Sequence, residues 1–333
     1  MSKLFPGILM CLIISTPAWL LGRIFPVIGG PVFGILLGML IALIKKPKTF
    51  DIGVKYTSKK LLQYSVILLG FDMNLYNVIK VGSQSMFVII FTLSISFLVA
   101  FLVGRALKVS QNIAILIGVG TSICGGSAIA ATAPIIGAED EEIANCISTI
   151  FLFNVLAVFI FPPLGHLFGL SDNGFGMWAG TAINDTSSVV AAGSSWSSMV
   201  GNDVALQFAT IVKLTRTLMI VPITLVLAIY ISTKATKPQC KQNFSFVKTF
   251  PWFVIAFLVA AVVNTFSGIP VEASHYLSNL GKFIIIMAMV AIGVNTNIKK
   301  LVLNGHKSII LGLFCWFSVA ITSLIVQLVT GLW

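Results

Sequence analysis

A run of small and hydroxyl residues interrupts an apolar stretch in the first half of the chain. Residues 117–127 read IGVGTSICGGS, and glycines mixed with hydroxyl side chains favour an interruption in a helix. The free N–H groups and positive dipole end of a half-helix can bind an anion. The alternative is that the small residues only allow close helix packing. We predict that substrate is bound here by Ser122, Cys124, Gly125, Gly126 and Ser127.

A second polar patch lies in the segment WAGTAINDTSSVVAAG, residues 178–193. A run of consecutive polar residues does not face lipid, and a carboxylate such as Asp185 at membrane depth is costly enough to indicate function. We predict that Asp185 binds a coupling ion. Its alternative role is a hydrogen-bonding centre that stabilises the interruption. Four neighbours are predicted to contact substrate: Asn184, Thr186, Ser187 and Ser188.

Two cations follow in the apolar run VALQFATIVKLTRTLMIVPI. Lys213 and Arg216 are three residues apart and so share one helix face. An ammonium and a planar guanidinium together could clamp an anionic substrate. Pairing with Asp185, or reaching to a membrane interface, would explain the two cations equally well. A further carboxylate, Asp72 in the segment LLGFDMNL, is our second candidate for binding a coupling ion.

The composition of the chain indicates which elements must position these residues. The 333 residues are 57% hydrophobic and only 9% charged, which is too apolar for a soluble core and surface. Long apolar runs favour helices over a barrel of short alternating strands. We predict an all-α integral membrane protein of about 10 to 11 transmembrane helices, forming one transporter domain over residues 1–333. The candidate runs are roughly 4–22, 27–44, 61–80, 85–104, 111–137, 143–162, 176–200, 204–231, 249–268, 277–297 and 308–331.

Basic residues cluster between the apolar runs, which indicates membrane orientation despite a net charge of +11 that could suggest nucleic acid. A cytoplasmic N-terminus makes 45–60 and 232–248 cytoplasmic basic loops and also places Arg105 and Lys108 inside. The acidic run 139–142 falls on the opposite side. We therefore expect a multi-pass protein of the plasma membrane with its C-terminus outside.

The first of two internal matches indicates an inverted repeat. The segment ILLGFDMNLYNVIKVGSQS, starting at Ile67, aligns without gaps with a segment ending at Ser308, and the match pairs Gly70 with Gly293. The predicted topology makes the two copies run in opposite directions, as an inverted repeat requires.

The second match pairs the two interruptions. GTSICGGSAIAA from Gly120 aligns with GTAINDTSSVVA from Gly180. With eleven crossings these two segments run in the same direction, unless one is a re-entrant hairpin and the number of crossings changes. The sequence leaves both arrangements open, broken crossing helices and re-entrant hairpins.

Together these segments resemble the YeiH-type multi-pass membrane proteins, a family labelled as sulfate exporters. More distantly, the Gly-Gly-Ser interruption followed by an acidic turn is similar to the bile-acid-symporter superfamily, which implies inverted repeats and crossed broken helices. Some YeiH-type members have a His-Glu pair where Asn184 and Asp185 stand, so the resemblance implies no histidine proton relay here. It covers nearly the whole chain and rests on LLGFDMNL (68–75), GTSICGGSAIAA (120–131), FGMWAGTAINDTSSVVAAG (175–193) and VKLTRTLMIVP (212–222).

These observations predict a secondary transporter, or exporter, of a small inorganic or organic anion such as sulfate or a sulfonate. Transport would occur by alternating access at the two interruptions. The alternative is a cation- or proton-coupled carrier or exchanger of another small solute that uses Asp185 and Asp72. The sequence lacks the GxxxxGK[ST] motif, which argues against ATP hydrolysis.

An intramembrane hydrolase is the remote alternative. Ser122 or Cys124 could serve as the nucleophile, but a nucleophile needs a nearby base, and the three histidines lie near loops. We expect no catalytic residues, cofactor or metal site. The expected partners are the anion and the lipid bilayer, without nucleic acid, and a homodimer is left open.

Overall fold

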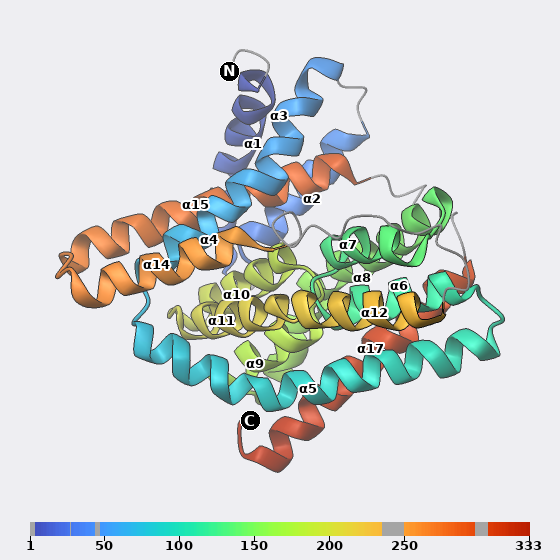
Figure 1. Cartoon of the computed structure of the whole chain (residues 1–333). Coiled ribbons are helices and arrows are strands. Elements are labelled where there is room, and N and C mark those ends of the chain that lie inside the picture. Colours follow the sequence, from blue (N-terminus) through green and yellow to red (C-terminus); the bar gives the residue numbers. More distant parts are fainter. Residues whose placement is uncertain (1–3, 27, 44–46, 235–249, 297–305) are drawn as a thin grey trace.

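The computed structural model describes residues 4–26, 28–43, 47–234, 250–296 and 306–333, and within these ranges it is helical with no strand (Figure 1). Large apolar side chains such as Phe101 and Phe317 are exposed, as expected for a perimeter that faces lipid. The chain is an all-α integral membrane protein. Six helical stretches of the described part are long and apolar enough to cross a membrane: α1 (Phe5–Ile24), α5 (Leu75–Ala106), α8 (Asp140–Leu167), Val204–Leu227, α15 (Val271–Asn295) and α17 (His306–Thr330).

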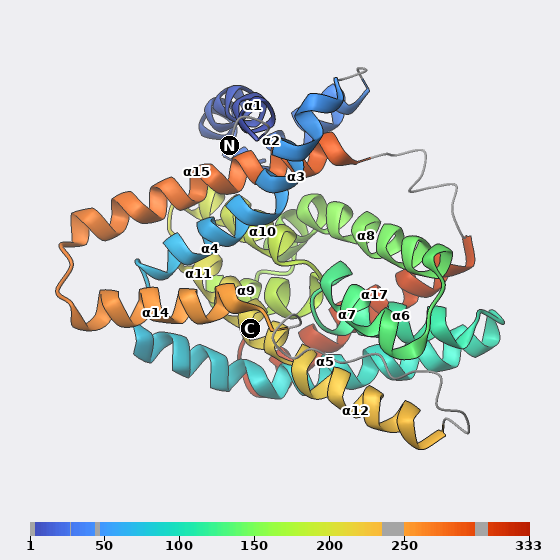
Figure 2. The ribbon, with the colours of Figure 1, turned by 45° about the horizontal axis from the view of Figure 1, so that its top comes forward.

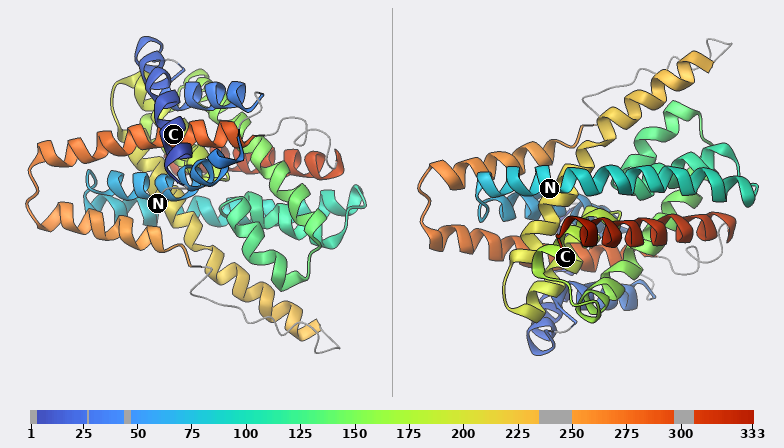
Figure 3. Two further views of the ribbon diagram at one scale, coloured as in Figure 1. Left: turned by 90° about the horizontal axis from the view of Figure 1, so that it is seen from above. Right: turned by 90° about the horizontal axis from the view of Figure 1, so that it is seen from below.

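Shorter helices pack beside α15. The helices α2 (Gly30–Ala42) and α4 (Leu62–Gly70) pack on it, and α14 (Trp252–Phe266) packs on α4. In Figure 3, α14 and α15 extend from one turn on one side of the molecule with α4 between them. Gly38 on α2 meets Gly293 on α15 at a backbone contact too close for a side chain on either residue. Glycine is needed here for close approach.

The first basic segment is more ordered than the predicted loop at 45–60. From Lys48 onward it forms a 3₁₀ turn, α3 (Asp51–Tyr56) and a π-helical turn that leads into α4. Val54 is fully buried in a cluster with Cys11 of α1, so tertiary packing makes this segment helical. Most of the second predicted loop, residues 235–248, lies outside the described residues.

One predicted boundary between spans is wrong. The sequence placed a break between residues 80 and 85, whereas the structure places it at 71–74 and continues α5 through 32 residues. Asn74 causes this break, because its side chain caps α5 by accepting a hydrogen bond from the Tyr76 backbone N–H at 2.8 Å.

The first repeat match joins helices that pack in opposite directions. In the pair α4 and α15, Ser65 lies beside Gly281, whereas Asp72, two residues past the end of α4, pairs with the earlier residue His275 at 3.5 Å. The pair is therefore antiparallel, as the inverted repeat predicts.

The next helices of the two copies, α5 and α17, behave alike. The thiol of Cys315 approaches the Ser96 carbonyl at 3.9 Å, and Leu311 lies near Gly104. As the residue number rises along α5 it falls along α17. The two copies are again antiparallel.

Candidate functional site

The first interrupted segment is a re-entrant hairpin made of α6 (Gln111–Ser122) and α7 (Gly126–Ile136). Ser110, which precedes α6, donates a 2.5 Å hydrogen bond to Glu142, and Asn112 donates one of 3.0 Å to the same carboxylate. Since Glu142 follows α7, the chain returns to the end at which it entered. We call residues 111–136 hairpin 1.

This return corrects the predicted placement of the acidic run 139–142. The run lies at the same end of the molecule as Arg105 at the end of α5, not on the opposite side. The prediction failed because it treated the apolar run 111–137 as one full crossing.

The second interrupted segment folds in the same way, through α9 (Asp172–Ala182) and α10 (Thr186–Val200). The Asp172 carboxylate at the start of α9 accepts hydrogen bonds from Trp196 at 2.7 Å and from Asn202 at 2.8 Å. Phe175 also stacks on Trp196, with ring centroids 4.1 Å apart. We call residues 172–200 hairpin 2.

The two hairpins are interrupted at equivalent positions of the second repeat match, at 123–125 and 183–185. Between them lies α8, whose 28 residues extend about 42 Å. Because α8 separates them, the hairpins enter from opposite ends, and Figure 2 shows hairpin 1 toward one end of α8 and α9–α10 toward the other. The expectation that both segments run in one direction was therefore wrong. Of the two arrangements left open, the structure has hairpins.

Local conformation explains both interruptions. Gly125 has φ +68° and ψ −130°, a region that only glycine adopts readily. In hairpin 2, Ile183 is extended, and Asp185 caps α10 by accepting hydrogen bonds from the backbone N–H and hydroxyl of Ser187. Asp185 thus has the hydrogen-bonding role that the sequence offered as its alternative. We call the residues at 121–127 and 183–188 the two tips.

Lys213 joins the tips from α11 (Val204–Leu218). Its fully buried ammonium donates to the carbonyls of Ile123 at 2.7 Å, Ile183 at 3.1 Å and Asn184 at 2.5 Å. An ammonium has three N–H donors, so these bonds use all of them. The carbonyls are those left free where α6 and α9 end, which is where a cation stabilises a helix.

Arg216, one turn later and also fully buried, binds the same two helix ends. It donates to the Ser122 carbonyl at 2.6 Å, to Ile183 at 3.2 Å and to the Thr121 carbonyl. The structure thus brings both predicted cations to the predicted tips, where they contact backbone carbonyls. These three bonds leave two of the five guanidinium N–H donors of Arg216 free.

Asn154 on α8 is part of this arrangement and was missed by the sequence analysis. Its side-chain oxygen accepts the backbone N–H groups of Asn184 at 3.1 Å and Asp185 at 3.2 Å, and it is 4% exposed. The signal available in the sequence was an amide side chain in the middle of the apolar run 143–162.

The Asn184 side chain is the clearest candidate for a direct ligand contact. It is 0% exposed, and neither its oxygen nor its nitrogen has a hydrogen-bond partner among the described residues. Gly125 of the other tip lies beside the Asn184 carbonyl. Because unpaired buried amides are costly, this one suggests a place for a polar ligand.

The other predicted site residues are divided between two regions. Around the tips, Cys124 and Ser188 are buried, Gly126 and Thr186 are half-buried, and Ser127 is exposed.

Asp72 lies elsewhere. Its carboxylate contacts His275 on α15 and accepts a 3.3 Å hydrogen bond from Gln207. Gln207 is six residues before Lys213, roughly 9 Å along the helix. The structure therefore does not bring Asp72 to the tips. The described residues contain no group of three or more His, Cys, Asp or Glu side chains that could hold a metal ion.

The charge balance at the tips favours an anion. Lys213 and Arg216 are buried cations, and Asp185 is the carboxylate of the two tips. Each hairpin contributes one helix C-terminus and one N-terminus, whose partial charges of about half a unit cancel. One positive charge remains in excess, and burial makes its field strong.

Comparison with known proteins shows relatives over the full length. The family model described as conserved hypothetical protein 698 matches residues 6–312. A UPF0324 membrane protein of Fusobacterium nucleatum is 49% identical over 99% of both chains. A relative from Streptococcus pyogenes is 51% identical over 98% of both chains. One from Streptococcus mutans is 48% identical over 98% of this chain and 97% of its own. No solved structure matches.

These matches agree with the architecture of long apolar helices. Since the family model covers most of the chain and several relatives are about half identical to it, the protein belongs to the family described as conserved hypothetical protein 698, alongside the UPF0324 membrane proteins.

Proposed function

We propose that the protein is a secondary transporter of a small anion, such as sulfate or a sulfonate, which binds between the two tips. The observation that carries this proposal is the meeting of two oppositely inserted hairpins at buried Lys213 and Arg216. Interrupted helices at membrane depth are stable only where protein or a wet cavity relieves their free backbone groups. Two such interruptions facing each other are the usual design of a secondary transport site.

The binding role of each group follows from its contacts. Lys213 has used its donors on carbonyls, so it attracts the anion through its charge, while Arg216 keeps two N–H groups. The direct donors are the Asn184 amide, the first N–H groups of α7 and the Thr186 N–H at the start of α10. Ser127 and Thr186 add hydroxyls at those helix ends.

Coupling to an ion gradient is assigned to Asp185 rather than Asp72. Asp185 lies at a tip, half-buried beside the predicted anion, and its charge offsets one of the two cations. Asp72 is held by His275 and Gln207 away from the tips. His166 stacks on Trp196, His275 contacts Asp72, and His306 is exposed at the start of α17. None of these contacts pairs a histidine with Ser122 or Cys124. This supports transport over hydrolysis.

We propose the plasma membrane as location and a cytoplasmic N-terminus. The end that carries Arg105 and Lys108 would face the cytoplasm by the positive-inside rule. Hairpin 1 then enters from the cytoplasm and hairpin 2 from outside.

Uptake into proteoliposomes, screened over sulfate, sulfite, sulfonates and small carboxylates, tests the proposal. Gly126→Val should abolish uptake, because the larger side chain covers the N–H groups of α7. The protein should stay inserted and monodisperse, because a Cβ at Gly126 meets only Ile147 at 3.8 Å. Ala130→Val, one turn away and also at an open position, is the matched control and should transport. Absence of anion uptake by the wild type, or normal uptake by Gly126→Val, would contradict the proposal.

A further inference from the structure

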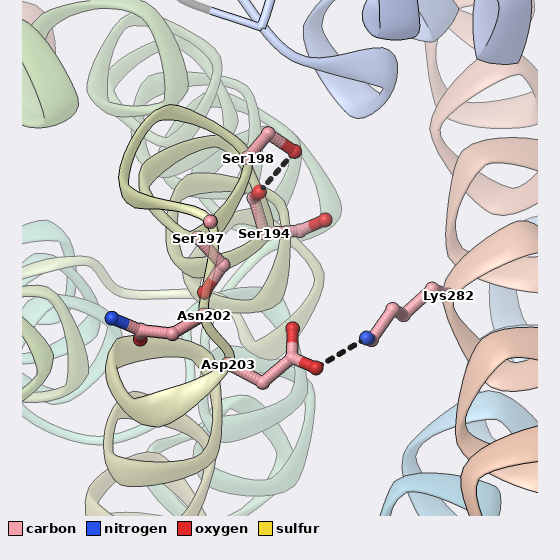
Figure 4. A pocket seen from close by; sticks show the side chains of 7 residues that line it. Ser194, Ser197, Ser198, Asn202, Asp203 and Lys282 are labelled. Atoms are coloured by element: carbon pink, nitrogen blue, oxygen red, sulfur yellow. Dashed lines mark hydrogen bonds and ion pairs between the residues drawn. The ribbon is translucent and has the colours of Figure 1, made fainter.

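A separate polar cavity lies between hairpin 2 and α15 (Figure 4). Its volume is about 250 Å³, and no apolar side chain is among its lining residues. We call it the outer cavity. It is lined by Gly201 and by the side chains of Ser194, Ser197, Ser198, Asn202, Asp203 and Lys282.

One ion pair supplies the charges of the outer cavity. The Lys282 ammonium reaches from α15 to the Asp203 carboxylate at 2.5 Å, as the dashed line in Figure 4 shows. About a quarter of the Lys282 side chain and a third of Asp203 are exposed. Ion pairs in contact with solvent contribute little to stability, so separating Asp203 from the ammonium costs little.

Hydroxyl donors stand beside this pair. Ser197 is 5% exposed, and its hydroxyl has no hydrogen-bond partner among the described residues. The Ser198 hydroxyl donates to the Ser194 carbonyl at 2.8 Å. An ammonium with a free buried hydroxyl is a set of donors suited to an oxyanion.

The outer cavity and the tip of hairpin 2 lie on one face of α10. Ser194 is seven residues from Ser187, which bonds to Asp185 at the tip, so the two serines share a helix face roughly 10 Å apart. Between them, Val190 and Ala191 are fully buried in one apolar cluster with Ile285. This apolar seal closes the cavity from the tips in the structure.

We propose that the outer cavity is a second binding site for the transported small oxyanion, at which the anion and Asp203 compete for Lys282. The inference rests on the proposed function. The cavity holds the anion outside the apolar seal, before it reaches the tips or after it leaves them. When the site is empty, Asp203 neutralises Lys282.

Opposite effects of two substitutions test the competition. Asp203→Asn removes the competing carboxylate and should lower the KM for sulfate uptake several-fold. Lys282→Gln removes the ammonium and should raise the KM about tenfold with kcat retained. Arg105→Gln, an exposed cation at the other end of the molecule, is the control. An ion pair that only holds α11 to α15 would make both variants change in the same direction, and that result would overturn the inference.

A binding measurement separates this site from transport itself. Ser197→Cys in a cysteine-free protein should react with a small thiol reagent, and sulfate should slow the reaction in the detergent-purified protein. Lys282→Gln should abolish the protection. Sulfate uptake without protection overturns the second site and leaves the proposed function intact. Protection without uptake of any anion would leave an oxyanion site in the outer cavity but would remove both the proposed function and the role of this site in transport.

Discussion

Lys213 and Arg216 stabilise a contact between two helix ends by hydrogen bonds to backbone carbonyls. A buried cation is costly unless its donors are satisfied. At this site, carbonyl groups at the ends of α6 and α9 satisfy them. The same residues can thus hold the tips together and leave an excess positive charge for an anion.

This arrangement predicts the outcome of a double substitution. Arg216→Gln should lower the thermal stability of the purified protein, because hydrogen bonds to a charged donor are worth about 1.5–3 kcal/mol each. Adding Asp185→Asn should not restore stability or transport, since Asp185 caps α10 rather than pairing with Arg216. Thermal unfolding and uptake by the double variant measure both effects. Recovery in the double variant would mean that the cation serves to neutralise Asp185.

The adjacent glycines of the first tip provide a second residue-scale prediction. Gly125→Ala should cost about 1–3 kcal/mol of stability, because the backbone there adopts a conformation that only glycine tolerates. Gly126→Ala should be nearly neutral, as the added methyl group has space. Unfolding temperatures of the two variants test the difference. Equal values would show that the backbone conformation at Gly125 does not require glycine.

At the scale of elements, each hairpin is closed at its base by a carboxylate: Glu142, at the start of α8, closes hairpin 1, and Asp172 closes hairpin 2. These contacts join residues about 30 positions apart. Each hairpin therefore begins and ends on the same side of the membrane. Because α8 crosses the membrane between them, the two hairpins enter from opposite sides.

Accessibility of single cysteines tests this topology. In a cysteine-free background, cysteines at Arg105 and Glu141 should react with an impermeant reagent from the same face, and a cysteine at Asn202 should react from the other. All three positions are exposed. Labelling of Arg105 and Glu141 from opposite faces would show hairpin 1 to be a full crossing.

At the scale of the whole molecule, hydropathy predicted the helices because long apolar runs have few alternatives in lipid. The glycine and hydroxyl pattern likewise predicted both interruptions. Hydropathy could not distinguish a re-entrant hairpin from a crossing, because both are apolar over the same length. That difference depends on distant contacts such as Ser110 with Glu142.

The same limit applies to the site. The sequence indicated which side chains gather at the tips, including Asn184 and Lys213, through their cost at membrane depth. It could not show that Lys213 contacts carbonyls or that Asn154 supports hairpin 2. It also could not show that Asp72 lies apart, because its contacts with Gln207 and His275 depend on the packing of α4, α11 and α15.

The fixed charges at the tips have a consequence for the membrane potential. Lys213, Arg216 and Asp185 together carry one net positive charge, so a bound monovalent sulfonate leaves the tips neutral and bound sulfate leaves one negative charge. If the tips move with the anion, each net charge carried across is worth about 2.3 kcal/mol per 100 mV. We expect sulfonate-for-sulfonate exchange in voltage-clamped proteoliposomes, in which only the loaded tips cross, to be insensitive to potential and sulfate-for-sulfate exchange to depend on it. Asp185→Asn, which adds one positive charge, should exchange the two behaviours, whereas an anion that moves past immobile tips would give the same voltage dependence in both proteins.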